Sequence, residues 1–164
     1  MDLILASSSK YRRAQLETLG LTFSAESPDI DETPTEGESP GALVERLAQQ
    51  KGAAVAAHHP GAVVIAGDQV AVHGAEILGK PGNRARAIAQ LTSLSGGEVR
   101  FLSALSVSGP GRPTVTCTEP TVVTFRDLTP GEIEKYVDLD EPFDCAGAIR
   151  SESLGPHLFA GVES

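Results

Sequence analysis

The sequence predicts a mixed α/β domain, and three observations lead to this fold class. The chain has 164 residues, a length typical of one domain. Hydrophobic residues make up 40% of it, which together with its 17 glycines is ordinary for a globular protein with a real core. Strand-like and helix-like segments alternate in the first half, whereas strands adjoin in the second, and this order predicts a mixed sheet with flanking helices.

The first half predicts two strands, each accompanied by a helix. Three serines follow the first apolar run, and Ser9 is suited to cap a helix. Three prolines and several acidic residues indicate a loop, and Pro40 is typical of a first helical turn. We expect Gly67 to end the second strand. In chain order, these segments are the strand Leu3–Ala6, the helix Lys10–Leu19, the loop Pro28–Pro40, the helix from Pro40 to His58 and the strand Val63–Ala66.

The second half predicts two hairpins and two helices. A turn at His73-Gly74 separates two short apolar runs, and "GPGRP" separates two long ones. The spacing of apolar residues predicts the first helix, which Gly96-Gly97 ends. "TPGE" is a capping box with proline at the first helical position. The segments are the strands Val70–Val72 and Glu76–Leu78, the helix Asn83–Leu94, the strands Glu98–Val107 and Val115–Arg126, and a helix that begins within Thr129–Glu132.

Composition excludes several classes of protein. The net charge of −9 argues against a surface for nucleic acid polymers, although a local basic cluster can still bind a small anion. Cys117 and Cys145 give neither a disulfide framework nor a zinc site. The start has no basic leader and no apolar run approaches the roughly 20 residues of a membrane span, so we expect a cytoplasmic protein without membrane segments.

The stretch "LILASSSKYRR" is typical of an anion site. Ser7 follows a buried strand, where hydroxyls and the backbone N–H groups of a helix start favour a negative ligand. Arg12 and Arg13 lie near the first turn of that helix, where they oppose the helix dipole, and a bound phosphate would compensate. The alternative is a capping serine followed by a solvated basic face. Both interpretations stay open from these residues alone.

Three further charged residues stand at unusual places. Lys51 falls on the apolar stripe of its helix, where it must pair or reach an edge with its long side chain. Asp68 follows a buried strand, a position suited to a general base or a metal ligand, or to a plain turn. Lys80 lies in "GKP", which is no P-loop because Pro81 replaces the Ser or Thr that holds magnesium. The cations could neutralise a polyphosphate, while Glu32 and Asp68 could hold a divalent cation and activate water. This combination of residues is typical of phosphoanhydride hydrolysis.

The chain resembles the Maf family of nucleoside triphosphate pyrophosphatases. The matching segments, in the family's order, are "LILASSSKYRR", "DIDETP", "ALVERLAQQKGAAV", "VVIAGDQV", "ILGKPGNRARAIAQLTSLSG" and "CAGAIRSESLG". The resemblance implies an elongated α/β fold with a central cleft, similar to inosine-triphosphate pyrophosphatases. It also implies hydrolysis of a nucleoside triphosphate to the monophosphate and pyrophosphate with Mg²⁺ or Mn²⁺, in a cytoplasmic protein that is often a homodimer. Such a domain would span residues 1–164, although relatives generally continue into a further C-terminal helix.

The resemblance also implies a role for each candidate residue. Asp68 matches the proposed proton acceptor, and Glu32 with Asp68 would hold the metal. The "GDQV" segment is similar to the branch that hydrolyses 7-methyl-GTP, because the dTTP and UTP branch usually has Thr after the Asp. Tyr11, whose simpler role is packing on its helix, would read a cationic methylated guanine together with Gln69 and Glu152. The phosphate-binding residues would be Ser7, Arg12, Arg13, Lys51 and Lys80.

Two other functions stay open at this point. A dTTP or UTP pyrophosphatase would use the same chemistry with a different base preference. A non-catalytic nucleotide-binding regulator of cell division would keep the basic residues but would not need Asp68. The presence of Asp68 and Glu32 favours the enzyme.

Overall fold

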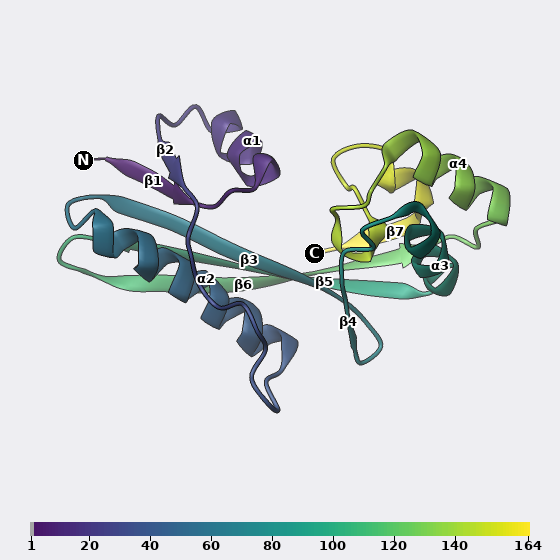
Figure 1. The fold of residues 1–164 in the computed structure, drawn as a ribbon, viewed down its shortest axis with the longest axis horizontal. Helices are drawn as coiled ribbons and strands as arrows, with labels where there is room; N and C mark the ends of the chain where they lie inside the picture. The colour runs from purple at the N-terminus through teal and green to yellow at the C-terminus, as the bar shows by residue number, and fades with distance from the viewer. Residues whose placement is uncertain (1) are drawn as a thin grey trace. The chain divides into compact units, whose positions relative to one another are not determined.

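A computed structural model describes residues 2–164, and over these residues the chain forms one seven-stranded mixed sheet and four α-helices (Figure 1). The sheet order is β2-β1-β3-β5-β6-β7, and β4 pairs with β3. The strands are β1 (Leu3–Ala6), β2 (Ser24–Glu26), β3 (Val63–His73), β4 (Glu76–Leu78), β5 (Glu98–Gly109), β6 (Arg112–Phe125) and β7 (Phe159–Glu163). The helices are α1 (Lys10–Thr18), α2 (Pro40–His58), α3 (Arg84–Leu94) and α4 (Pro130–Asp140), with short 3-10 turns η1 (Ala146–Ala148) and η2 (Gly155–Leu158). The mixed α/β class is confirmed.

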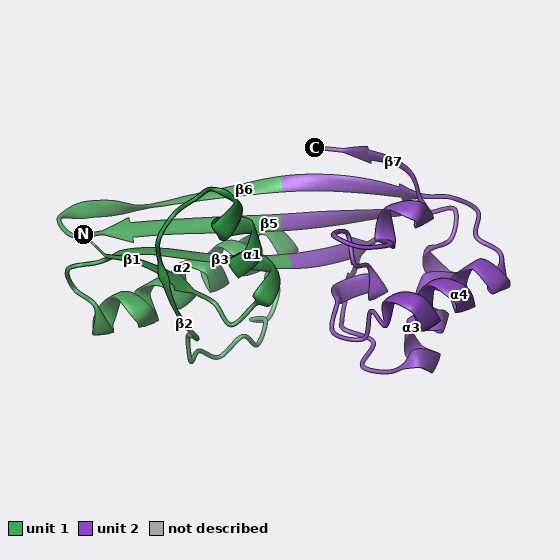
Figure 2. Ribbon diagram, turned by 90° about the horizontal axis from the view of Figure 1, so that it is seen from above, with its two compact units in different colours: residues 1–69, 103–119 green, residues 70–102, 120–164 purple. Residues whose placement is uncertain are grey.

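The chain divides into two compact units, and Figure 2 colours them separately. Unit 1 comprises the residues up to Gln69 and Ser103–Glu119, and unit 2 comprises Val70–Leu102 and Pro120–Ser164. The long strands β3, β5 and β6 each contribute residues to both units. The single domain, the elongated outline and the central cleft expected above stay predictions.

Unit 1 is built on parallel strands and one long helix. β1 pairs in parallel with both β2 and β3. Ser39 caps α2 by accepting a hydrogen bond from the backbone N–H of Ala42, and Pro40 occupies the first turn, as predicted. The buried residues that join α2 to the sheet are Ile4, Ala6, Val55, Ala62, Val64 and Ala66.

Unit 2 packs two helices and the far ends of the long strands around a larger apolar core. Thr129 and Glu132 form the predicted capping box at the start of α4. The β3–β4 hairpin also forms as predicted, with Val72 opposite Ile77. The largest fully buried apolar side chains in this unit are Leu91, Leu94, Val99, Ile133 and Val137.

The prediction that Gly67 ends a strand is wrong. β3 runs unbroken from Val63 to His73, so the two strands expected on either side of Gly67 are one. A Cβ at this position would lie 2.9 Å from the carbonyl oxygen of Ala104. Gly67 therefore permits a close approach of the β5 backbone rather than a turn.

Two strands were missed. β2 has three residues and pairs with β1. β7 pairs with residues Val122–Phe125 of β6, which are distant from it in the sequence. Neither carries a strong local apolar alternation, so their partners decide that they are strands. β5 and β6 are also longer than predicted at their shared turn.

Candidate active site

The candidate site lies in unit 1, where parallel pairing of β1 and β3 stops. The last parallel pair joins Ala6 to Ala66. Ser7 follows β1 directly, and Asp68 lies two residues beyond Ala66 along β3. Asp68 thus stands inside a strand and not at its end, which corrects the expected position. It still lies beyond the carboxyl end of β1, the edge at which parallel strands place ligands.

Three charged side chains converge there. The ammonium of Lys51 lies 2.6 Å from Oδ1 of Asp68 and 3.0 Å from Oε1 of Glu32. Lys51 and Asp68 are buried, at 7% and 8% exposure, whereas the Glu32 side chain is 58% exposed. Lys51 therefore pairs inside the protein rather than reaching an edge, and it links a buried carboxylate to one that faces solvent.

Arg12 is a fourth charge close to these three. Burial lowers the pKa of its guanidinium, and the negative charges of Asp68 and Glu32 act in the opposite direction. Its Nε lies 3.7 Å from the position that a Cβ on Gly67 would take. Arg12 remains a cation at neutral pH because an Arg guanidinium does not lose its proton in proteins. Two cations and two carboxylates thus share the site.

Serines order the turn between β1 and α1. The Ser7 hydroxyl accepts a hydrogen bond from the backbone N–H of Ser9 at 3.1 Å. The Ser9 hydroxyl accepts from the N–H of Arg12 at 3.4 Å, so Ser9 is the predicted cap. Both hydroxyls therefore bind protein N–H groups and hold the turn that carries Arg12 toward Asp68.

The two arginines of the opening stretch have different neighbours. Arg13 is exposed, and its guanidinium lies 5.9 Å from the centroid of the Phe23 ring. Arg12, by contrast, is influenced by the charges of Asp68 and Glu32. A role for Arg13 on phosphate stays a prediction.

The residues expected to read the base also have structural partners. The Lys10 ammonium lies 4.9 Å from the centroid of the Tyr11 ring, a cation–π contact of the kind predicted for a methylated base. The Gln69 amide donates a hydrogen bond to the hydroxyl of Ser103 at 2.9 Å. Gln69 is therefore oriented by β5, its neighbour in the sheet.

Lys80 and Glu152 belong to unit 2. Lys80 is exposed after β4. Glu152 is exposed between η1 and η2, with Oε1 3.9 Å from Nε of Arg150 and Oε2 accepting a hydrogen bond from Ser151. Their placement beside the residues of unit 1 stays a prediction.

Glu32 and Asp68 fit a magnesium or manganese ion by the chemistry of their donors. Over residues 2–164, no group of three or more His, Cys, Asp or Glu side chains is arranged to hold a metal. Mg²⁺, however, commonly takes only one or two carboxylates and completes its shell with water and substrate phosphates. Glu32 and Asp68 already meet at one positive charge, the Lys51 ammonium, so their oxygens lie where a cation is favoured.

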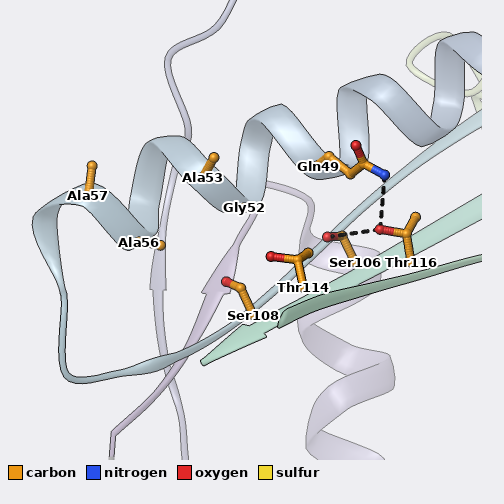
Figure 3. A pocket seen from close by; sticks show the side chains of 9 residues that line it. All are labelled: Gln49, Gly52, Ala53, Ala56, Ala57, Ser106, Ser108, Thr114 and Thr116. Carbon is orange, nitrogen blue, oxygen red and sulfur yellow. Dashed lines mark hydrogen bonds between the residues drawn. The ribbon is translucent and has the colours of Figure 1, made fainter. Parts of the chain in front are cut away.

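A cavity of about 630 Å³ also occurs in unit 1, between α2 and the strands β5 and β6 (Figure 3). Alanines of α2 form one wall, and hydroxyls of the strands form the other. Gln49 donates to Thr116, which in turn donates to Ser106. None of the predicted site residues lines this cavity, so the charged cluster and not the cavity is the candidate site.

Sequence reasoning missed a side chain of α2 that contacts the loop bearing Glu32. Arg46 of α2 binds both carboxylate oxygens of Glu38, at 2.6 and 2.8 Å, and the carbonyl oxygen of Thr33 at 3.1 Å. The signal available in the sequence was the acidic Glu38 directly before the capping Ser39, followed by Arg46 about two turns into the helix. Ser103 was also missed, because a lone serine in a strand carries no pattern.

The sequence of the chain matches a family model and several known proteins. The model of the family described as "Maf-like protein" matches residues 2–164. A protein of Alcanivorax borkumensis named 7-methyl-GTP pyrophosphatase is 50% identical over 163 residues, covering 98% of this chain and 82% of that one. A protein of the same name from Xanthomonas oryzae pv. oryzae is 51% identical, covering 99% and 85%.

Solved structures support the fold alone. The Ham1 protein of Staphylococcus aureus has a TM-score of 0.54 at 18% identity, covering 77% of this chain and 73% of that one. A HAM1 protein from Coxiella burnetii has a TM-score of 0.53 at 16% identity, covering 76% and 73%.

Between residues 2 and 164, the helices are too short or too polar to span a membrane.

Proposed function

The chain belongs to the Maf family, and from that premise we propose that it is a nucleoside triphosphate pyrophosphatase that acts on 7-methyl-GTP. The observation that carries this proposal is the convergence of two cations, Lys51 and Arg12, on the carboxylates of Asp68 and Glu32. Relatives about 50% identical over nearly the whole chain bear the name of that activity, which supports the substrate. The products are the nucleoside monophosphate and pyrophosphate.

In this proposal, Asp68 is the general base. Its buried carboxylate accepts a proton from a water molecule, and the oxygen of that water attacks a phosphorus of the triphosphate. The phosphoanhydride bond breaks and pyrophosphate leaves. Lys51 and Arg12 neutralise the negative charge of the phosphates. The Ser7 hydroxyl, which also holds the turn that presents Arg12, donates a hydrogen bond to a phosphate oxygen.

Glu32 and Asp68 would hold the metal, Mg²⁺ or Mn²⁺. Such an ion, when bound, supplies a positive charge that neutralises phosphate oxygens during hydrolysis. The exposed position of Glu32 and the buried position of Asp68 suit an ion that must meet a substrate arriving from solvent.

The remaining candidate residues are assigned to binding the phosphates and recognising the base. Arg13 and Lys80 bind phosphate, and Tyr11, Gln69 and Glu152 recognise the methylated guanine, whose positive charge an aromatic face and a carboxylate both favour. A cytoplasmic location and a homodimer, both common among family members, belong to the same proposal.

The test is pyrophosphate release with Mg²⁺ or Mn²⁺ from 7-methyl-GTP, GTP, dTTP, UTP, CTP and ATP, for the wild type and Asp68→Asn. We expect selective turnover of 7-methyl-GTP, lowered about 100-fold or more in kcat by the substitution. Preference for dTTP or UTP would keep the chemistry and refute the substrate. A folded protein that binds nucleotide without turnover would be a regulator instead.

A further inference from the structure

Glu32 lies in a segment that gives it little support of its own. Between β2 and α2, residues 27–39 form neither helix nor strand, and the Glu32 side chain is 58% exposed. Holding such a residue in one place costs conformational entropy. Something else must therefore keep its carboxylate at the Lys51 ammonium.

One guanidinium binds the segment on both sides of its turn. Nη2 of Arg46 donates to the carbonyl oxygen of Thr33, the residue after Glu32, at 3.1 Å. Nε and Nη2 of Arg46 bind the two carboxylate oxygens of Glu38, and Oε2 of Glu38 accepts the backbone N–H of Thr35 at 3.0 Å. The segment is thus tied to α2 just after Glu32 and again five residues later.

This arrangement differs from an ordinary surface ion pair. Exposed pairs contribute little, but a bidentate Arg–carboxylate pair with limited exposure is an exception. The Glu38 side chain is only 7% exposed and that of Arg46 is 25% exposed. The hydrogen bonds from Arg46 also lower the pKa of Glu38 to about 2, so its carboxylate stays charged at neutral pH. Nη1 of Arg46 donates to Gln50 of the same helix, which fixes the guanidinium further.

Arg46 and Lys51 stand on one rigid element. Both belong to α2, five residues apart, which corresponds to about 7.5 Å along the helix axis. The helix that presents the ammonium therefore also anchors the loop that brings Glu32 to it. Asp31 adds a local turn, because its Oδ1 accepts the backbone N–H of Thr33 at 2.9 Å.

We propose that Arg46 and Glu38 are positioning residues that hold Glu32 at the Lys51 ammonium. The consequence for activity rests on the proposed function, in which Glu32 takes part in hydrolysis. A lysine cannot replace Arg46, because a single ammonium cannot span two carboxylate oxygens and a backbone carbonyl as the planar guanidinium does.

A double-mutant cycle tests whether Arg46 acts through Glu32. We expect Arg46→Gln and Arg46→Lys each to lower kcat/KM for 7-methyl-GTP about tenfold and to raise the Mn²⁺ concentration for half-maximal rate. In the Glu32→Gln background, the same Arg46→Gln change should cost less than twofold. Equal costs in both backgrounds would overturn the proposal. Glu38→Gln provides an independent second variant should Arg46→Gln fail to fold.

The matched control is Arg84→Gln. Arg84 makes the same two-pronged contact with Asp138, at 2.6 and 3.0 Å, but in unit 2 and between α3 and α4. We expect this variant to keep the wild-type kcat/KM. A loss equal to that of Arg46→Gln would mean that removing any such pair harms the enzyme, and would overturn the specific role.

Amide hydrogen exchange provides a readout that does not depend on turnover. Arg46→Gln should speed exchange in residues 31–38 at least fivefold relative to the wild type, and Arg84→Gln should not. Unchanged exchange in this segment overturns the positioning role even in an active enzyme. A wild type without turnover refutes the proposed function, while the exchange result still decides whether Arg46 holds the segment.

Discussion

The ammonium of Lys51 lies 2.6 Å from Oδ1 of Asp68, and both side chains are buried. Burying two opposite charges costs free energy unless the two groups pair with each other. Here the Lys51 ammonium also pairs with a second carboxylate, that of Glu32. The Lys51–Asp68 pair joins α2, the longer helix of unit 1, to the middle of β3, the strand that bears the proposed base.

Removing the cation should destabilise the protein. Lys51→Met leaves Asp68 as a buried carboxylate without its partner, a change that costs about 3 kcal/mol. We expect that loss in the free energy of unfolding measured by urea denaturation. The double variant Lys51→Met/Asp68→Asn removes both charges and should recover most of it. A double variant as unstable as Lys51→Met would show that packing, not charge, sets the cost.

A methyl group at position 67 should strain the sheet. Gly67→Ala would bring a Cβ within 2.9 Å of the Ala104 carbonyl oxygen, so one strand must shift, at a cost of about 1–3 kcal/mol. Calorimetry should show a lower Tm. Gly61→Ala is the matched control, because nothing lies within 4 Å of its Cβ position. Equal Tm changes in the two variants would contradict the close-approach explanation.

Glu38 should make stability depend on acid pH. Its pKa is lowered from 4.5 to about 2, chiefly by the hydrogen bonds from Arg46. A carboxylate with a depressed folded pKa stabilises the protein above its unfolded pKa, and this contribution is lost as pH falls from about 4.5 toward 2. Glu38→Gln lacks that titration. The free energy of unfolding of the wild type should therefore fall more steeply over this range, and identical slopes would argue against the Glu38–Arg46 pair.

Base preference should shift when the candidate base-reading residues change. Glu152→Gln removes a negative charge proposed to favour the methylated guanine, and we expect the ratio of kcat/KM for 7-methyl-GTP to that for GTP to fall about tenfold. Gln69→Thr introduces the residue of the dTTP and UTP branch and should reduce the same ratio. Pyrophosphate release assays measure both. An unchanged ratio in both variants would refute their assignment to base selection.

Local signals in the sequence determined most helices and their ends. Ser39 with Pro40 begins α2, and Thr129 with Glu132 begins α4, because capping joins residues only three positions apart. The burial of Lys51 was also predictable, since the helical period alone places it on the apolar face.

Tertiary structure decided whatever depends on distant neighbours. In the sequence Gly67 looks like the end of a strand, but β3 continues through it and the backbone of β5 at Ala104 lies close to it. Arg12 and Arg13 are adjacent in the sequence, yet one lies among carboxylates and the other over Phe23. The sequence by itself determined which charged residues are candidates for the site. Which of them meet was decided by packing, because contacts between residues 17 or more positions apart leave no periodic pattern along the chain.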